Sequence, residues 1–292
     1  MDNLVETFCF VDDFMKKFME EWNKYLISSG KKTRNRKSQL SCSEIATILI
    51  LFHRSGARNF KTFYLQHICY YLKHLFPNCV SYSRFIQLQK SFLVPLYYLS
   101  QALKGEQTGV YFIDSTTLKV CHIKREKQNK VFKDIAKKSK STMGWYFGFK
   151  LHLIINNKGE IMSCRITDSA TSDVSVAEDL TEGLIGKLIG DKGYISSSLS
   201  DLLMGKGLQL ITKIKKNMKN FFVKMEDKIL LGKRAIIESV NDQLKNICQI
   251  EHSRYRAPYS FLLNVFCGII AYQFKEKKPH LKSKRPDNLK IA

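Results

Sequence analysis

The sequence predicts an α/β domain whose mixed sheet is flanked by helices, preceded by an all-helical N-terminal domain. Apolar residues recur at helical spacing as far as about residue 105, short β-rich runs begin at Val110, and helical stretches alternate with those runs further on. We therefore divide the chain into a helical domain over 1–105, an α/β domain over 106–274 and a basic tail over 275–292.

The predicted first helix has one continuous apolar face. Its apolar residues lie three or four positions apart: Leu4, Phe8, Val11, Met15, Phe18, Trp22 and Tyr25. A basic linker follows over Ser28–Ser38, and Ser41 with Glu44 forms a capping box for a second helix. We predict a third helix over Phe60–Leu75 and a fourth over Ser83–Leu103. Such short helices beside basic residues fit a helix-turn-helix DNA reader and equally a plain helical bundle.

The sheet is predicted from five short runs rich in β-branched, aromatic and aliphatic residues. They are Val110–Ile113, Phe149–Ile155, Glu160–Ile166, Leu188–Gly190 and Leu208–Ile211. Residues 156–159, Asn-Asn-Lys-Gly, are turn-forming, so we expect the second and third runs to be antiparallel neighbours. Helices are predicted over Val174–Leu184, Ser198–Met204 and Lys233–Asn246, and an apolar one begins at Tyr259.

The charge of the chain indicates a polyanionic partner. There are 48 Lys plus Arg against 26 Asp plus Glu, a formal net charge of +22. The basic residues form four blocks, over 31–37, 124–140, 213–224 and 275–290, and the second carries eight basic residues against two acidic ones. One such block is as well explained by a solvated loop, but four together favour nucleic acid.

Membrane association and export are not expected. The most apolar segment, Tyr259–Phe274, contains Asn264 and Gln273 and is typical of a buried helix. Acidic residues near the N-terminus oppose a secretory signal, and the eight cysteines form no CxxC pair and no zinc-site spacing. These features favour a cytoplasmic protein with reduced thiols.

Two aspartates follow buried strands directly. Asp114 comes after Tyr111–Ile113 and Asp191 after Leu188–Gly190, so both side chains are expected to point into the space at the end of the sheet. A single strand-end Asp is more often a turn or a helix cap, but two matched cases favour a shared site. Phosphodiester chemistry with two metal ions needs acidic groups that converge from different elements, and Glu238 on the predicted helix over Lys233–Asn246 is the third candidate.

Three short motifs together resemble the insertion-sequence DDE transposases. These are Ile-Asp-Ser-Thr at 113–116, Gly-Asp-Lys-Gly-Tyr at 190–194, and Arg234, Glu238 and Lys245 separated by three and six residues. With the runs at 148–152, 212–217 and 251–256, the sequence is most similar to insertion sequence family 982, over about residues 80–272.

That resemblance implies a ribonuclease-H-like catalytic domain in which Asp114, Asp191 and Glu238 bind two Mg²⁺ or Mn²⁺ ions. The implied reaction is hydrolysis at the ends of the element to free a 3′-hydroxyl, followed by attack of that hydroxyl on target DNA. The implied partner is double-stranded DNA, which includes the terminal inverted repeats of the element and the target. The resemblance also implies that the active protein is at least a homodimer and that it is associated with the nucleoid.

Basic residues near the motifs are predicted to contact DNA phosphates. They are Lys192, Lys213, Arg234, Lys245, Arg254 and Arg256. Each is otherwise an ordinary surface charge.

Other acidic residues and histidines are weaker candidates. Asp168 and Asp173 fall in a loop that opens a helix, where Asp173 would be a cap. We expect His152 to be structural or to face DNA. For His252 the sequence favours neither of these two roles. Two alternative functions remain, a nuclease of the same fold and a non-enzymatic, sequence-specific DNA-binding protein derived from a transposase.

Overall fold

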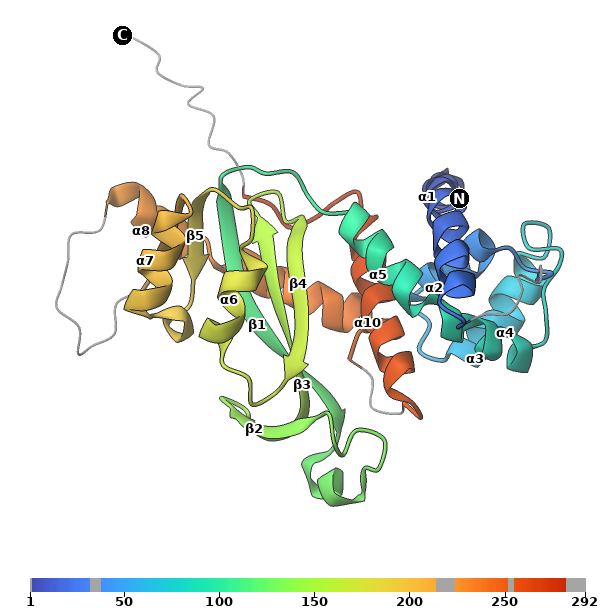
Figure 1. Ribbon diagram of the computed structural model, residues 1–292. Helices are drawn as coiled ribbons and strands as arrows, with labels where there is room; N and C mark the ends of the chain where they lie inside the picture. Colours follow the sequence, from blue (N-terminus) through green and yellow to red (C-terminus); the bar gives the residue numbers. More distant parts are fainter. Residues whose placement is uncertain (1, 32–37, 214–223, 252–254, 282–292) are drawn as a thin grey trace, which may run out of the picture. The chain divides into compact units, whose positions relative to one another are not determined.

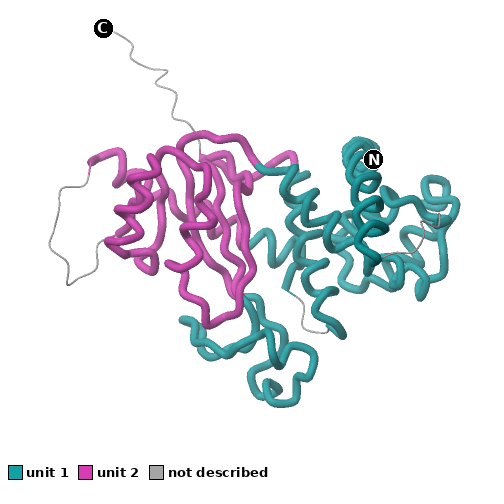
Figure 2. Tube along the Cα trace, viewed as in Figure 1, with its two compact units in different colours: residues 1–104, 118–149, 242–275 teal, residues 105–117, 150–241, 276–292 magenta. Residues whose placement is uncertain are grey.

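A computed structural model describes residues 2–31, 38–213, 224–251 and 255–281 (Figure 1). The chain divides into two compact units (Figure 2): unit 1 consists of 1–104, 118–149 and 242–275, and unit 2 of 105–117, 150–241 and 276–292. The units interleave along the chain, while the predicted domains are continuous. The boundaries at 105 and 274 stay a prediction, because compactness does not show which part folds independently.

The N-terminal part of unit 1 is helical, as predicted. Its helices are α1 (Asp2–Ser28), α2 (Cys42–Arg54), α3 (Phe60–Thr62), the π-helix η1 (Phe63–Tyr71), α4 (Tyr82–Leu88), the 3₁₀-helix η2 (Gln89–Phe92) and α5 (Leu93–Ala102). The predicted capping box is confirmed, since Ser41 Oγ accepts from the Glu44 backbone N–H and Glu44 Oε2 accepts from the Ser41 backbone N–H. The apolar helix α10 (Pro258–Gln273) packs against α2 and α5.

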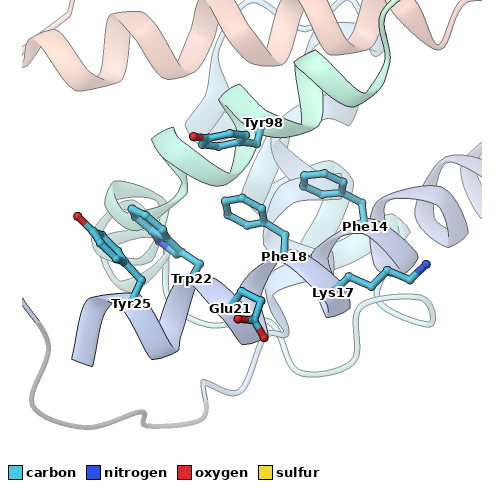
Figure 3. A pocket seen from close by; sticks show the side chains of 7 residues that line it. All are labelled: Phe14, Lys17, Phe18, Glu21, Trp22, Tyr25 and Tyr98. Carbon is cyan, nitrogen blue, oxygen red and sulfur yellow. The ribbon is translucent and has the colours of Figure 1, made fainter. Parts of the chain in front are cut away.

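A groove of about 580 Å³ runs along α1 and is lined mainly by aromatic rings (Figure 3). Phe14, Phe18, Trp22 and Tyr25 stack in sequence along the helix, and Tyr98 of α5 faces Phe18 at 5.2 Å between ring centroids. Its only lining carboxylate is Glu21. The groove is therefore no candidate for a site that needs converging carboxylates.

Six strands form one mixed sheet. They are β1 (Val110–Cys121), β2 (Lys137–Ser141), β3 (Gly144–Asn156), β4 (Ile161–Asp168), β5 (Gly186–Gly190) and β6 (Leu208–Thr212). Their order is β2-β3-β1-β5-β6, and β4 also pairs with β3. The pairs β1 with β5 and β5 with β6 are parallel. The predicted hairpin between β3 and β4 is confirmed, with Asn156 N–H donating to Glu160 O.

Two features of the sheet differ from the prediction. The sequence did not indicate β2, because its Lys and Ser residues lack apolar alternation. In the sheet, β2 lies at the edge beside β3. Strand β1 runs on past Ile113 to Cys121, so Asp114 lies within a strand rather than at its end. The polar run Asp114–Thr117 hid this continuation from a pattern based on hydrophobicity.

The core of unit 2 lies where helices pack on the sheet. Helices α6 (Asp173–Leu180) and α7 (Ser197–Gly205) bury Val176, Leu199 and Leu203 in one cluster with Tyr111 and Leu188 of the sheet. The predicted helix over Lys233–Asn246 is α9 (Ala235–Asp242), followed by a π-helical turn, η5 (Gln243–Ile247).

Some of the described helical segments were not predicted. They include α8 (Met225–Gly232) and the 3₁₀-helices η3 (Ile123–Gln128) and η4 (Lys192–Tyr194). Among the described ranges, no helix is long and apolar enough to cross a membrane.

Candidate active site

Asp114 and Asp191 belong to neighbouring parallel strands, Asp114 within β1 and Asp191 directly after β5. Phe112 of β1 pairs with Ile189 of β5, and each aspartate comes two residues after its member of that pair. Because the two strands are parallel and in this register, both aspartates lie at the same level of the sheet. Asp191 directly follows β5, as predicted, and caps the short 3₁₀-helix η4 (Lys192–Tyr194). The sheet therefore brings two carboxylates from distant sequence positions to one place in unit 2.

The Asp114 carboxylate is held by two donors. Its Oδ1 accepts from Arg234 Nη2 at 3.0 Å, and its Oδ2 accepts from Asn241 Nδ2 at 3.1 Å. The side chain is only 18% exposed. Burial raises the pKa of Asp114 to about 6, against the lowering effects of Arg234 and of the Ser115 backbone N–H, and the charge of Asp191 raises it further. Asp114 is thus a desolvated carboxylate that needs a nearby positive charge.

Arg234 links Asp114 to Glu238. Its Nη1 donates to Glu238 Oε1 at 3.0 Å while Nη2 donates to Asp114. Glu238 is 60% exposed, whereas Arg234 is 17% exposed and its buried Nε has no hydrogen-bond partner. The predicted pair, Asp114 and Glu238, is therefore brought together through a guanidinium.

The sequence analysis missed Asn241. It is 6% exposed, and its Oδ1 is buried without a partner. A signal was present, because Arg234, directly before α9, and Glu238 and Asn241 on it follow one another at spacings of four and three, which is the spacing of one helix face. A polar stripe on a helix whose other face carries Ile236, Ile237 and Val240 indicates a buried polar contact.

Tyr194 anchors the loop that follows β5, because its buried ring packs against Gly190 next to the site. A Cβ added to Gly190 would lie 3.2 Å from Ile113 and 3.3 Å from the Tyr194 ring, so only a glycine leaves room for that ring without a shift. The Tyr194 hydroxyl is buried without a hydrogen-bond partner. Burial first, and then the charges of Asp173 and Asp114, raise the pKa of Tyr194, so it stays protonated. This packing gives a physical reason for the Gly-Asp-Lys-Gly-Tyr motif at 190–194.

Asp173 lies near the loop that carries Asp191. It is the first residue of α6, and the cap is Ser172, so the cap assigned to Asp173 was wrong. Its Oδ1 accepts from Lys150 Nζ at 3.1 Å, and its Oδ2 would lie 3.7 Å from a Cβ added to Gly193. Asp173 therefore belongs to the surroundings of the site, neutralised by Lys150. Asp168 accepts from the Ala170 backbone N–H and forms a turn.

His152 is a structural residue. Its side chain is fully buried on β3, and Nε2 lies 2.9 Å from Thr167 Oγ1. Burial lowers its pKa to about 4, so the ring is neutral at neutral pH. A DNA-facing position is therefore excluded for His152, while His252 lies outside the described residues.

The predicted DNA-binding residues fall in different places. Lys192 and Lys213 are exposed in unit 2, after β5 and β6, and Arg234 holds the carboxylates. In unit 1, Lys245 pairs with Glu251 at 3.4 Å and Arg256 is exposed before α10. Arg254 lies outside the described residues.

The oxygen donors of the site suit a hard divalent cation, which prefers carboxylate ligands. Asp114, Asp191 and Glu238 supply such oxygens, and Asn241 Oδ1 is a further buried acceptor without a partner. In the described residues no three His, Cys, Asp or Glu side chains stand close enough to hold a metal ion. The positive charge between Asp114 and Glu238 is that of Arg234. The chemical type of these oxygens fits a hard cation, while in this arrangement the Arg234 guanidinium lies between the carboxylates of Asp114 and Glu238.

Comparisons with known proteins show the family and the fold of the chain. A family model described as a transposase DDE domain matches residues 104–258, more than half of the chain. A solved piggyBac transposase synaptic complex with hairpin DNA matches with a TM-score of 0.52 at 9% identity, over 93% of this chain and 74% of that one. The Mos1 strand transfer complex matches with a TM-score of 0.24 at 8% identity, over 88% of this chain and 84% of that one. No curated protein matches the sequence.

The first structural match, with the sheet order, confirms the predicted fold class, a ribonuclease-H-like mixed sheet flanked by helices after a helical N-terminal region.

Proposed function

Because this chain belongs to the family of proteins with a transposase DDE domain, we propose that Asp114, Asp191 and Glu238 are its catalytic carboxylates in DNA cleavage and strand transfer. The proposal is supported by the register of β1 and β5, which brings Asp114 and the residue after β5, Asp191, to one level, and by Arg234, which joins Asp114 to Glu238. We assign the chain to insertion sequence family 982 on the motifs at 113–116, 190–194 and 234–245.

The substrate is double-stranded DNA, cut at the ends of the element and joined to a target. Hydrolysis frees a 3′-hydroxyl, and that hydroxyl then attacks a phosphodiester of the target DNA. The net charge of +22 suits this substrate. Assembly on two ends requires at least a homodimer in the active complex, which acts at the nucleoid.

Asp114, Asp191 and Glu238 would hold two Mg²⁺ or Mn²⁺ ions. When bound, these ions supply activation of the attacking oxygen and neutralisation of charge on the leaving oxygen. Asn241 fixes the rotamer of Asp114 through its hydrogen bond to Oδ2. Glu238, whose side chain is 60% exposed, changes position at little cost in packing.

Arg234 has two roles in this proposal. Without DNA it pairs with Asp114 and Glu238 through two hydrogen bonds and offsets part of their negative charge. With DNA bound, its planar guanidinium is suited to a phosphate oxygen pair, which leaves the carboxylates free for the cations. Lys192 and Lys213 are exposed and follow the neighbouring strands β5 and β6. They supply further phosphate contacts.

The decisive experiment is cleavage and joining of labelled DNA taken from the native flanks, with Mg²⁺ or Mn²⁺. The wild type is compared with Asp191→Ala and with Asp201→Ala, an exposed aspartate on α7 that serves as the matched control. We expect products from the wild type and the control and none from Asp191→Ala. Cut but unjoined strands would favour a nuclease, and salt-sensitive binding without any product would favour a DNA-binding protein.

A further inference from the structure

The hairpin of β2 and β3 in unit 1 carries an exposed aromatic residue between lysines. Trp145 is 57% exposed, and Met143 in the turn is 89% exposed. Lys138 Nζ and Lys140 Nζ lie 5.1 Å and 6.0 Å from the centre of the Trp145 ring. Both side chains therefore leave more than half of their surface uncovered at the tip of the hairpin.

The three side chains share one face of the hairpin. Lys140 pairs directly with Trp145 across the two strands, and Lys138 lies two residues further along β2. Because side chains alternate between faces, Lys138 and Lys140 both lie on the face that Trp145 occupies. In the protein without DNA, two ammonium groups therefore lie over the π surface of this ring at cation–π distance.

The surrounding segment fixes the class of partner. Residues 124–140 carry eight basic residues against two acidic ones. Glu126 pairs with Lys138 at 3.7 Å, and both side chains are partly exposed. A protein partner would need an unusually acidic surface to match this charge. A nucleic acid supplies both negative charge and flat rings that stack on an aromatic side chain.

We propose that this hairpin is a DNA contact separate from the carboxylate site, at which Lys138 and Lys140 bind phosphates and Trp145 stacks on an unpaired base. The proposal rests on the proposed function only in that the substrate is DNA. Lysines on an exposed edge strand also prevent strand-to-strand association, but that purpose explains neither Trp145 nor Met143.

Tryptophan fluorescence tests the stacking directly, because the chain has two tryptophans, Trp22 and Trp145. In a Trp22→Phe background, Trp145 is the single reporter, and no metal ion is added. The full chain is titrated with a perfectly paired duplex and with the same duplex carrying a short unpaired segment. We expect stronger quenching by the second DNA, and equal quenching by both would overturn the stacking role.

Affinity measurements by DNA anisotropy separate the two contributions. Trp145→Ala should weaken binding of the partly unpaired DNA about tenfold, in line with the loss of one stacked base. The double variant Lys138→Gln and Lys140→Gln should weaken both DNAs and lower the slope of log K against log salt by roughly 2. Tyr70→Ala, which removes an exposed ring on η1 away from the basic segment, is the control and should change neither affinity.

The outcomes distinguish this proposal from the proposed function. Trp145 emission that stays unchanged at saturating DNA, in a protein that cleaves and joins DNA, overturns the hairpin contact alone. Quenching and weakened binding in a protein that never cleaves DNA supports the contact and removes the catalytic assignment. Unchanged melting temperature of Trp145→Ala excludes loss of folding, as expected for a side chain at an exposed position.

Discussion

Arg234 Nη2 donates to Asp114 Oδ1 at 3.0 Å, across 120 residues of sequence. The same guanidinium holds Glu238, so one positive charge is shared between two of the three proposed catalytic carboxylates. Arg234 therefore offsets only part of the negative charge of the proposed cation site. Four predictions follow from this site and from the sheet that carries it.

Arg234→Gln should strengthen binding of Mn²⁺ to the DNA-free protein. The variant removes the cation that competes for Asp114 and Glu238, and a partly exposed ion pair of about 1 kcal/mol corresponds to about a fivefold gain in affinity. Calorimetric titration of the protein with Mn²⁺ measures it. Lys192→Gln removes an exposed charge beside Asp191 and is the control for general electrostatics. An unchanged or weaker affinity in Arg234→Gln would show that Arg234 does not compete with the metal.

Glu238→Gln should abolish cleavage and leave the fold intact. A lost metal ligand is expected to reduce the rate at least about a hundredfold, since even outer groups of metal sites cost 10–100-fold. The side chain is 60% exposed, so the melting temperature should hardly change. Cleavage of end DNA and thermal unfolding are measured together, with the exposed Glu182→Gln as the matched variant. Full activity in Glu238→Gln would remove Glu238 from the catalytic set.

The stability of the protein should carry a pH-dependent contribution from Asp114. Its folded pKa of about 6 lies above the ordinary value of 3.8, because burial disfavours the charged form. The unfolded chain therefore loses this proton first, and stability from this group is fully present below pH 4 and is lost as the pH rises through 6.

Asp114→Asn should remove that dependence. Two pKa units correspond to about 3 kcal/mol, so the unfolding free energy of the variant relative to the wild type should rise by up to that amount from pH 4 to pH 7. Urea unfolding at several pH values measures the difference. Parallel pH curves for the two proteins would contradict the raised pKa.

Gly148→Ala should destabilise the sheet. A Cβ at this position would lie 2.1 Å from the backbone oxygen of Leu118, which cannot move aside without disturbing β1. Overpacking of this kind costs about 1–3 kcal/mol. Gly205→Ala, where an added Cβ meets open space, is the control and should be neutral or stabilising. Denaturant unfolding compares the two, and equal stabilities would mean that β1 and β3 separate easily at this point.

The sequence by itself determined the class of fold, the order of the carboxylates and the local contexts of the site. Alternating apolar runs indicated five of the six strands, the Ser41 capping box was correct, and Asp191 and Glu238 follow a strand and lie on a helix as expected. These features depend on neighbours a few positions apart, which periodicity and turn chemistry record.

Only the tertiary structure decided which groups meet. The contact of Asn241 with Asp114, the bridging by Arg234, the burial of Tyr194 beneath Gly190 and the pairing of β2 with β3 all join residues through strand order and helix docking. The hydrophobic pattern of a sequence does not record where its polar residues point. The partner of a polar residue therefore depends on which elements the core brings together. Burial against those elements also sets the pKa of Asp114, because desolvation arises from the packed sheet and not from the adjacent sequence.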